Sequence, residues 1–117
     1  MSEIDLDALD DATKAVAGAW FGMMRPGKGD LTFNLREGRP SDEAIDALGK
    51  LVRAKVISVE AFNRYGGLVY RPLVDCRPAM LWLHRNIGNP AAAVKMTEPL
   101  AGGEKQARAI QKRCLAA

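Results

Sequence analysis

The chain has 117 residues, of which 48% are hydrophobic and 26% are charged, and its formal net charge is +3. These values predict one globular domain spanning residues 1–117 and argue against a disordered chain. No apolar stretch approaches the roughly 20 residues of a membrane-spanning helix, and the acidic start MSEIDLDALDD lacks the basic-then-apolar order of a signal peptide. We therefore expect a cytoplasmic protein that does not contact a membrane.

The charge is distributed unevenly along the chain. Residues 1–46 hold ten acids and five bases, a net −5, whereas residues 47–117 hold four acids and twelve bases, a net +8. Two interpretations remain open at this point. Either the later part forms a basic face for an anionic partner, or the two parts neutralise each other in the fold.

The first predicted element is an amphipathic helix from about Leu6 to Met24, with acids in its first turns, where they favour the helix dipole. The glycines and proline of RPGKGD (25–30) end it. LTFNL (31–35) then alternates apolar and polar residues as a half-buried strand does. Ser41 is the expected N-cap of a second helix that runs to about Ala54. The apolar stripe of the first helix is predicted to comprise Leu9, Thr13, Val16, Trp20 and Met23.

The stretch VISVEAFNRYGGLVYRPLV (56–74) has two interpretations. In one, Ser58 caps a short helix that runs to Tyr65 and ends at a glycine. In the other, alternating β-branched residues form a strand, Asn63 and two glycines make a turn, and LVYRPLV returns as its antiparallel partner. We favour the ribbon, because three β-branched residues cluster within four positions at its start.

The last part of the chain is predicted to be helical. Pro78 suits the start of a helix that reaches Gly88, and Asn89 would cap a short helix through Met96. TEPLAGG (97–103) is predicted to be a flexible break before a basic helix over residues 104–115. The predicted fold class is α+β: an N-terminal helix, a small antiparallel sheet of about three strands with an inserted helix, and a helical C-terminal third.

The order DEAIDALGKLVRAKVISVE (42–60) followed by GGLVYRPL (66–73) resembles the second half of a winged-helix domain, in which a recognition helix precedes a strand, a wing and a returning strand. This resemblance implies nucleic-acid binding through the helix start and the wing. Two features depart from the pattern. The span from Leu35 to Lys55 fits one helix instead of two, and the first turns of that helix carry Asp42, Glu43 and Asp46, which would repel phosphate.

The residues that usually carry catalysis are sparse. The chain has one histidine, His84, and two cysteines, Cys76 and Cys114, without the spacing of metal ligands. Gly-Lys-Gly at 27–29 lacks the surrounding residues of a phosphate-binding loop. We therefore expect no enzyme activity, no metal and no cofactor.

We predict instead a non-catalytic binding or regulatory module that engages nucleic acid or a nucleoprotein through its basic later part. The alternative is a small adaptor or inhibitor, of the type that mobile elements such as phages encode, which acts by occluding a partner protein. Aromatic residues interleave with bases near the ribbon, and the last predicted helix carries a basic stripe. The candidate binding residues are Arg64, Tyr65, Arg71, Arg77, Lys105, Arg108, Lys112 and Arg113.

Overall fold

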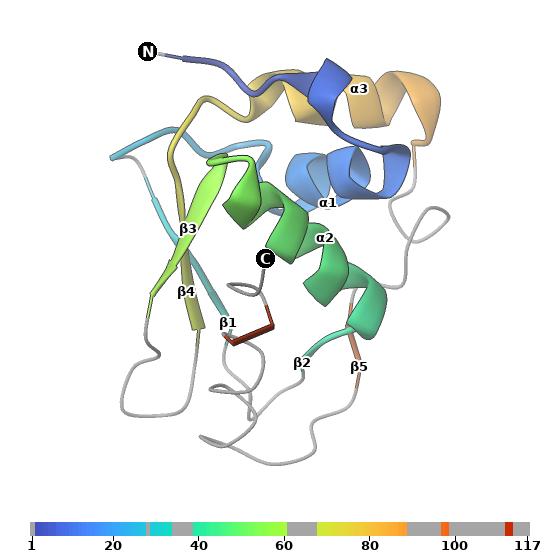
Figure 1. Ribbon diagram of the computed structural model, residues 1–117. Helices are drawn as coiled ribbons and strands as arrows, with labels where there is room; N and C mark the ends of the chain where they lie inside the picture. Colours follow the sequence, from blue (N-terminus) through green and yellow to red (C-terminus); the bar gives the residue numbers. More distant parts are fainter. Residues whose placement is uncertain are drawn as a thin grey trace.

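Helices and antiparallel strands alternate along the chain (Figure 1). The computed structural model describes residues 2–27, 29–33, 39–60, 68–88, 97–98 and 112–113. Its main elements confirm the α+β class predicted from the sequence. In chain order they are the 3-10 helix η1 (Leu6–Ala8), α1 (Asp11–Phe21), β1 (Leu31–Phe33), β2 (Arg39–Pro40), α2 (Asp42–Arg53), β3 (Ile57–Glu60), β4 (Leu68–Pro72), α3 (Arg77–Asn86) and β5 (Thr97–Glu98).

The N-terminal α-helix begins later than the sequence predicted. Leu6–Ala8 form the single turn η1, and Leu9 is extended, with φ −121° and ψ 146°. The carboxylate of Asp10 then accepts hydrogen bonds from the backbone N–H and the hydroxyl of Thr13, both at 2.8 Å. A capping residue has extended backbone angles, so Asp10 separates the two helical segments. The prediction of one helix from Leu6 was wrong because Asp10 caps the helix instead of lying inside it.

The early end of α1 also changes which side chains it buries. The helix stops at Phe21, whose side chain is fully buried. Met23 lies beyond the helix and is 80% exposed, so its predicted place on the apolar stripe was wrong. Residues three and four positions apart lie on the same face only within the helix, and Met23 is outside it.

The second helix begins as predicted. Ser41 is buried, and its hydroxyl oxygen accepts a hydrogen bond from the Ala44 N–H at 3.1 Å. This bond satisfies one of the N–H groups that a helix start leaves without a partner. Ile45, Leu48 and Leu51 then follow at three-residue steps and are all buried, so α2 packs one apolar face inward.

The end of α2 is a Schellman motif. The N–H of Val56 bonds the carbonyl of Leu51 at 2.9 Å, and the N–H of Lys55 bonds that of Val52 at 3.0 Å. This geometry places Lys55 in the left-handed region, with φ 61°, where glycine is the usual residue. The turn reverses the chain directly into β3.

The main sheet is antiparallel, in the order β1-β4-β3. Ser58 of β3 lies opposite Arg71 of β4, and Thr32 of β1 lies opposite Val69 on the other side of β4. The helical interpretation of residues 58–65 was therefore wrong for Ser58–Glu60, which are strand. The remainder of that segment, 61–65, lies outside the described residues.

Two predicted elements fall largely outside the described residues. These are the short helix that ends at Met96 and most of the helix over 104–115, of which Lys112 and Arg113 are described and helical. Thr97 and Glu98 form β5, which pairs antiparallel with β2, Pro40 opposite Thr97.

Helices α1 and α3 lie side by side (Figure 1). Their approach is close at Gly18, where an added Cβ would stand 2.5 Å from the carbonyl oxygen of Ala79 and 3.1 Å from the Cβ of Leu83. An added Cβ at Gly22 would stand 2.5 Å from the Cβ of Met80. Glycine is thus required in α1 because a side chain would push the helices apart.

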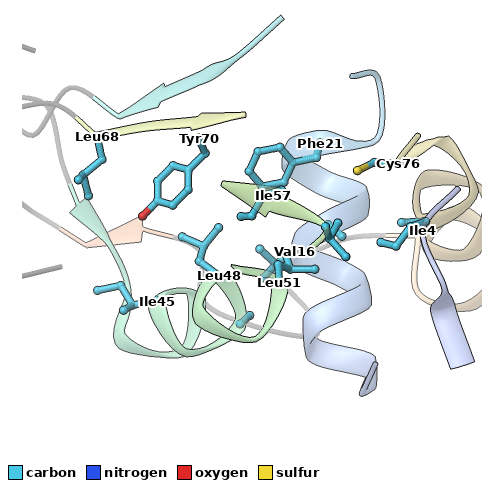
Figure 2. Close-up of a cluster of buried hydrophobic side chains, with 14 residues drawn as sticks. Ile4, Val16, Phe21, Ile45, Leu48, Leu51, Ile57, Leu68, Tyr70 and Cys76 are labelled. Carbon is cyan, nitrogen blue, oxygen red and sulfur yellow. The ribbon is translucent and has the colours of Figure 1, made fainter. Parts of the chain in front are cut away.

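The core lies between α2, the inner face of the sheet and α1 (Figure 2). The rings of Phe21 and Tyr70 meet edge to face, with centroids 6.4 Å apart, a favourable geometry for an aromatic pair. Alternate residues of β4 face this core and are buried, whereas Arg71 lies on the opposite face of the sheet and is exposed. The largest fully buried side chains are Thr13, Val16, Phe21, Ile45, Leu48, Leu51, Ile57, Leu68 and Tyr70.

Candidate functional site

The structure describes four of the eight candidate binding residues, namely Arg71, Arg77, Lys112 and Arg113. Arg64, Tyr65, Lys105 and Arg108 lie outside the described residues. Arg71 is on β4, Arg77 is the first residue of α3, and the other two are near the end of the chain. The three described guanidinium groups each bind carboxylates of the same chain.

Arg71 links the three strands of the main sheet. Its Nε donates to the Oδ2 of Asp30 at 3.1 Å, just before β1, and its Nη1 forms an ion pair with Glu60 of β3. The hydrogen bond with Asp30 and the charge of Glu60 raise the pKa of Arg71 above its ordinary value. Because one guanidinium bonds carboxylates on both sides of β4, it holds the outer face of the sheet together.

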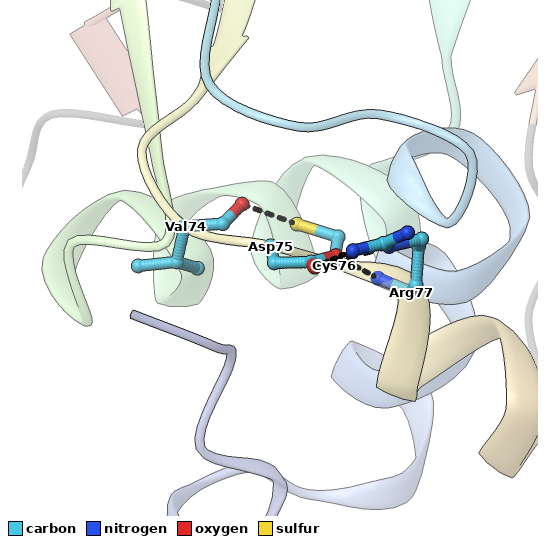
Figure 3. A network of polar contacts seen from close by, with 4 residues as sticks. All are labelled: Val74, Asp75, Cys76 and Arg77. Carbon is cyan, nitrogen blue, oxygen red and sulfur yellow. Dashed lines mark hydrogen bonds and ion pairs between the residues drawn. The ribbon is translucent and has the colours of Figure 1, made fainter. Parts of the chain in front are cut away.

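Arg77 is bound to the carboxylate of Asp75 (Figure 3). Its Nε lies 2.9 Å from Oδ1 and 3.0 Å from Oδ2, and its Nη2 lies 2.5 Å from Oδ2. Asp75 Oδ1 also accepts from the backbone N–H of Arg77 at 3.0 Å, so it caps α3 where Cys76 gives no side-chain cap. These bonds hold the pKa of Asp75 at about 2. Arg77 therefore stabilises the start of α3.

The backbone of Asp75 also secures the N-terminal segment. Its carbonyl accepts from the N–H of Ile4 at 3.0 Å, and its N–H donates to the carbonyl of Ser2 at 2.9 Å. Ile4 is buried as a result. The segment Val74–Arg77 is thus a structural junction between the chain start, β4 and α3.

Cys76 lies in the same junction, with its thiol buried and donating to the carbonyl of Val74 at 3.5 Å (Figure 3). Burial, with a smaller effect of the charge on Asp75, raises the pKa of Cys76 to about 11. The thiolate is the reactive form of cysteine, so this thiol is protonated and unreactive at neutral pH. His84, the one histidine of the sequence, is exposed on α3.

Arg113 contacts the start of α2. Its Nη1 lies 2.8 Å from Asp42 Oδ1, and its Nη2 lies 3.1 Å from Asp46 Oδ1. The two acids are one helical turn apart, so a single planar guanidinium reaches both. The hydrogen bond to Asp42 is the main cause of a raised pKa at Arg113. Two of the acids that the sequence predicted to repel phosphate are therefore bound to a base.

The ion pairs of Arg71 and Arg113 share a pattern with that of Lys50. Lys50 bonds Asp10, which lies before α1, and this contact is the main cause that lowers the pKa of Asp10 to about 2. Each of these three bases comes from residues 47–117 and bonds an acid of residues 1–46. The charge asymmetry of the sequence is thus cancelled in part within the fold, as the second of its two interpretations supposed.

Several cations remain without a carboxylate partner among the described residues. They are exposed and lie on different elements, Lys55 after α2, Arg85 on α3 and Lys112 near the chain end. The exposed stripe of α3 also carries an apolar side chain, Leu81, which is 52% exposed. The described surface therefore offers scattered positive charges instead of one dense basic patch.

Sequence reasoning missed the acids that bind these arginines. Asp75 was predictable in principle, because an Asp two residues before a helix start commonly bonds the backbone there. Glu60 was also predictable once the ribbon register was assumed, since diagonal neighbours across two strands are within reach of long side chains. No local signal connects Arg113 with Asp42, which is 71 positions away.

The described residues contain no group of three or more metal-ligating side chains that could hold an ion. Over the same ranges, no helix has the length and apolarity to cross a bilayer. The chain matches no known protein family, no curated protein and no solved structure.

Proposed function

We propose that the protein is a non-catalytic, cytoplasmic module that binds nucleic acid, alone or within a nucleoprotein complex, through the ribbon that follows α2. The observation that carries this proposal is the pairing of β3 with β4 immediately after α2. With this pairing, residues 61–67 connect two antiparallel neighbours. They hold Arg64 and Tyr65 and no acid.

The helix, strand and returning strand follow one another in the order that the winged-helix resemblance implies. A basic and an aromatic side chain in the connection could contact the phosphate backbone and stack on a base. The acids in the first turns of α2 make base reading by the helix unfavourable. The proposed mode is therefore recognition of charge and shape by the ribbon, with little preference for sequence.

The ion pairs of the described arginines refine the list of contact residues. Arg71 and Arg77 already bind carboxylates that hold the sheet and α3 in place. A phosphate would have to replace those carboxylates, so these two arginines are structural residues in this proposal. The proposed contacts are Arg64, Tyr65, Lys105, Arg108 and Lys112.

The test is the binding of a fluorescent duplex and a fluorescent single strand, followed by anisotropy at low and moderate salt. We expect the affinity to fall steeply with salt, since log K falls by about 0.9 per log unit of salt for each phosphate contacted on duplex DNA. Arg64→Glu should weaken binding by at least about tenfold and reduce this slope by about one or two contacts.

Arg85→Glu is the matched control, because it makes the same charge change at an exposed position of α3. It should weaken binding far less than Arg64→Glu. Equal losses from the two variants would refute the role of the ribbon and leave only general attraction between charges. The absence of binding by micromolar protein at low salt would refute nucleic-acid binding altogether.

The exposed stripe of α3 favours a second candidate function, binding of a partner protein by an adaptor or inhibitor. Leu81 lies half-exposed on this stripe, and an apolar side chain is stabilised by burial against a protein surface but not by contact with phosphate. Leu81→Lys should leave nucleic-acid affinity unchanged or slightly raised. If the variant loses its biological activity while its nucleic-acid affinity is intact, the adaptor function is the correct one.

A further inference from the structure

The exposed face of α3 combines an apolar side chain with positive charge. Leu81 is 52% exposed, and Arg77 and Arg85 lie one helical turn before and after it, on the same face. His84 is exposed as well. The helix Arg77–Asn86 contains no acid. This face therefore suits a partner that offers carboxylates beside an apolar contact.

Carboxylates of this kind lie next to α3 in the same chain. Residues 2–8 contain no base and three exposed acids, which are Glu3, Asp5 and Asp7. This segment is anchored just before the start of α3, because the N–H of Ile4 bonds the carbonyl of Asp75 at 3.0 Å. Figure 1 shows the chain start and α3 at the same end of the molecule. An acidic segment thus adjoins a basic helix face.

These charges are available for a contact with another molecule. Within the part of the chain that the structure describes, neither Asp7 nor Arg85 forms an ion pair. The carboxylate of Asp5 accepts the backbone N–H of Asp7 at 3.1 Å but stays exposed. Arg77 differs from Arg85, since it already bonds Asp75.

From this arrangement we propose that two copies of the chain associate through α3 in an isologous dimer. Two α3 helices that pack antiparallel about Leu81 place the end of each, with Arg85, beside the start of the other, where the acidic segment is anchored. Both charge contacts form at once, because an isologous interface uses the same surface on each copy. The partner protein at this stripe is then a second copy of the chain, and nucleic-acid binding by the ribbon is not required for it.

The size of the surface sets the expected affinity. The ten residues of α3 span about 15 Å, so this face buries less than the roughly 800 Å² per partner of a stable interface. We expect a dissociation constant on the order of 100 µM. The protein is then a monomer at the micromolar concentrations of the nucleic-acid assays.

Sedimentation equilibrium of the full chain from about 10 µM to 1 mM tests the dimer. The mass should rise from 12.7 kDa towards twice this value. Leu81→Lys places two cations at the twofold axis and should weaken association at least about tenfold. Leu73→Lys is the matched control, because Leu73 is 49% exposed but bonds the carbonyl of Val56, before β3. A constant mass for the wild type, a mass that continues to rise beyond the dimer, or equal losses from the two variants would overturn the proposal.

A charge exchange tests the pairing itself. Asp5→Lys/Asp7→Lys and Arg85→Glu alter exposed side chains, and each should weaken self-association by about tenfold, since like charges then face each other. An equimolar mixture of the two should associate about as well as the wild type. In the mixed dimer, the new lysines meet the new glutamate, and the remaining Arg85 meets the unchanged acids. A mixture that associates no better than either variant alone would overturn the proposed contact.

Discussion

The close approach of α1 and α3 predicts that Gly18→Ala destabilises the protein. The new Cβ would stand 2.5 Å from the Ala79 carbonyl oxygen and 2.9 Å from its carbon, whereas ordinary C···O contacts begin near about 3.3 Å. The helices would have to separate, and overpacking of this kind costs roughly 1–3 kcal/mol. The better helix propensity of alanine offsets about 1 kcal/mol of this. We expect a net loss of up to about 2 kcal/mol, equivalent to a fall in Tm of up to roughly 8 °C.

Ala19→Gly is the matched control, since Ala19 is the exposed neighbour in α1. It should cost about 1 kcal/mol through helix propensity alone. Urea unfolding followed by circular dichroism gives the free energy of unfolding of both variants. Suppose that Gly18→Ala raises the free energy of unfolding by about as much as Ala19→Gly lowers it. Helix propensity would then be the only effect, and the close contact of α1 and α3 at Gly18 would be refuted.

Three further predictions concern single residues at element ends. Lys55→Gly should stabilise the protein by about 0.5–1 kcal/mol, because glycine adopts a φ of 61° without the clash of a Cβ; a loss of stability in urea unfolding would contradict this. Ser41→Ala should cost about 1 kcal/mol and Ser41→Asn much less, since only alanine leaves the buried Ala44 N–H without its acceptor; equal costs would contradict the capping role. Asp75→Asn should reduce the loss of unfolding free energy that the wild type shows as the pH falls into the acid range. Arg77 depresses the pKa of Asp75 to about 2, so this carboxylate stabilises the fold fully above about pH 4 and loses its effect as the pH falls through about 2. Urea midpoints from pH 5 to 2 measure this, and parallel curves for the two proteins would refute it.

The parts of the fold that the sequence predicted well are those with local causes. The α2 helix has a capping serine, acids in its first turn and apolar residues at three-residue steps, and its start was predicted correctly at Ser41. The strands of the ribbon were predicted from clustered β-branched residues, and β3 and β4 are paired. The start of α1 was missed because Asp7, Asp10 and Asp11 are equally good first-turn acids, and only the hydrogen bonds of Thr13 show which one is the cap.

The partners of the candidate binding residues were much less predictable. An ion pair between residues 41 or 71 positions apart depends on which surfaces the packing of α2 and the sheet brings together. Hydrophobic periodicity indicates which face of an element is buried, but it does not indicate which polar side chains meet at the rim of that face. Arg71 was predicted as a binding residue from the bases and aromatic residues of the ribbon, and Arg113 from the basic stripe of the last helix. In the structure, Asp30, Asp42 and Asp46 bond their guanidinium groups.

These internal ion pairs limit which basic residues are available to bind phosphate. A cation that already bonds a carboxylate gains little from phosphate, because it exchanges one anionic oxygen for another. The net charge of +8 over residues 47–117 therefore overstates the charge that a partner would meet. Arg64 differs in its sequence context, since residues 61–67 contain one base and no acid. The preceding acid, Glu60, is already paired with Arg71. Among the candidate residues, charge reversal at Arg64 therefore discriminates most sharply between a ribbon that binds phosphate and a fold whose charges serve mainly to hold it together.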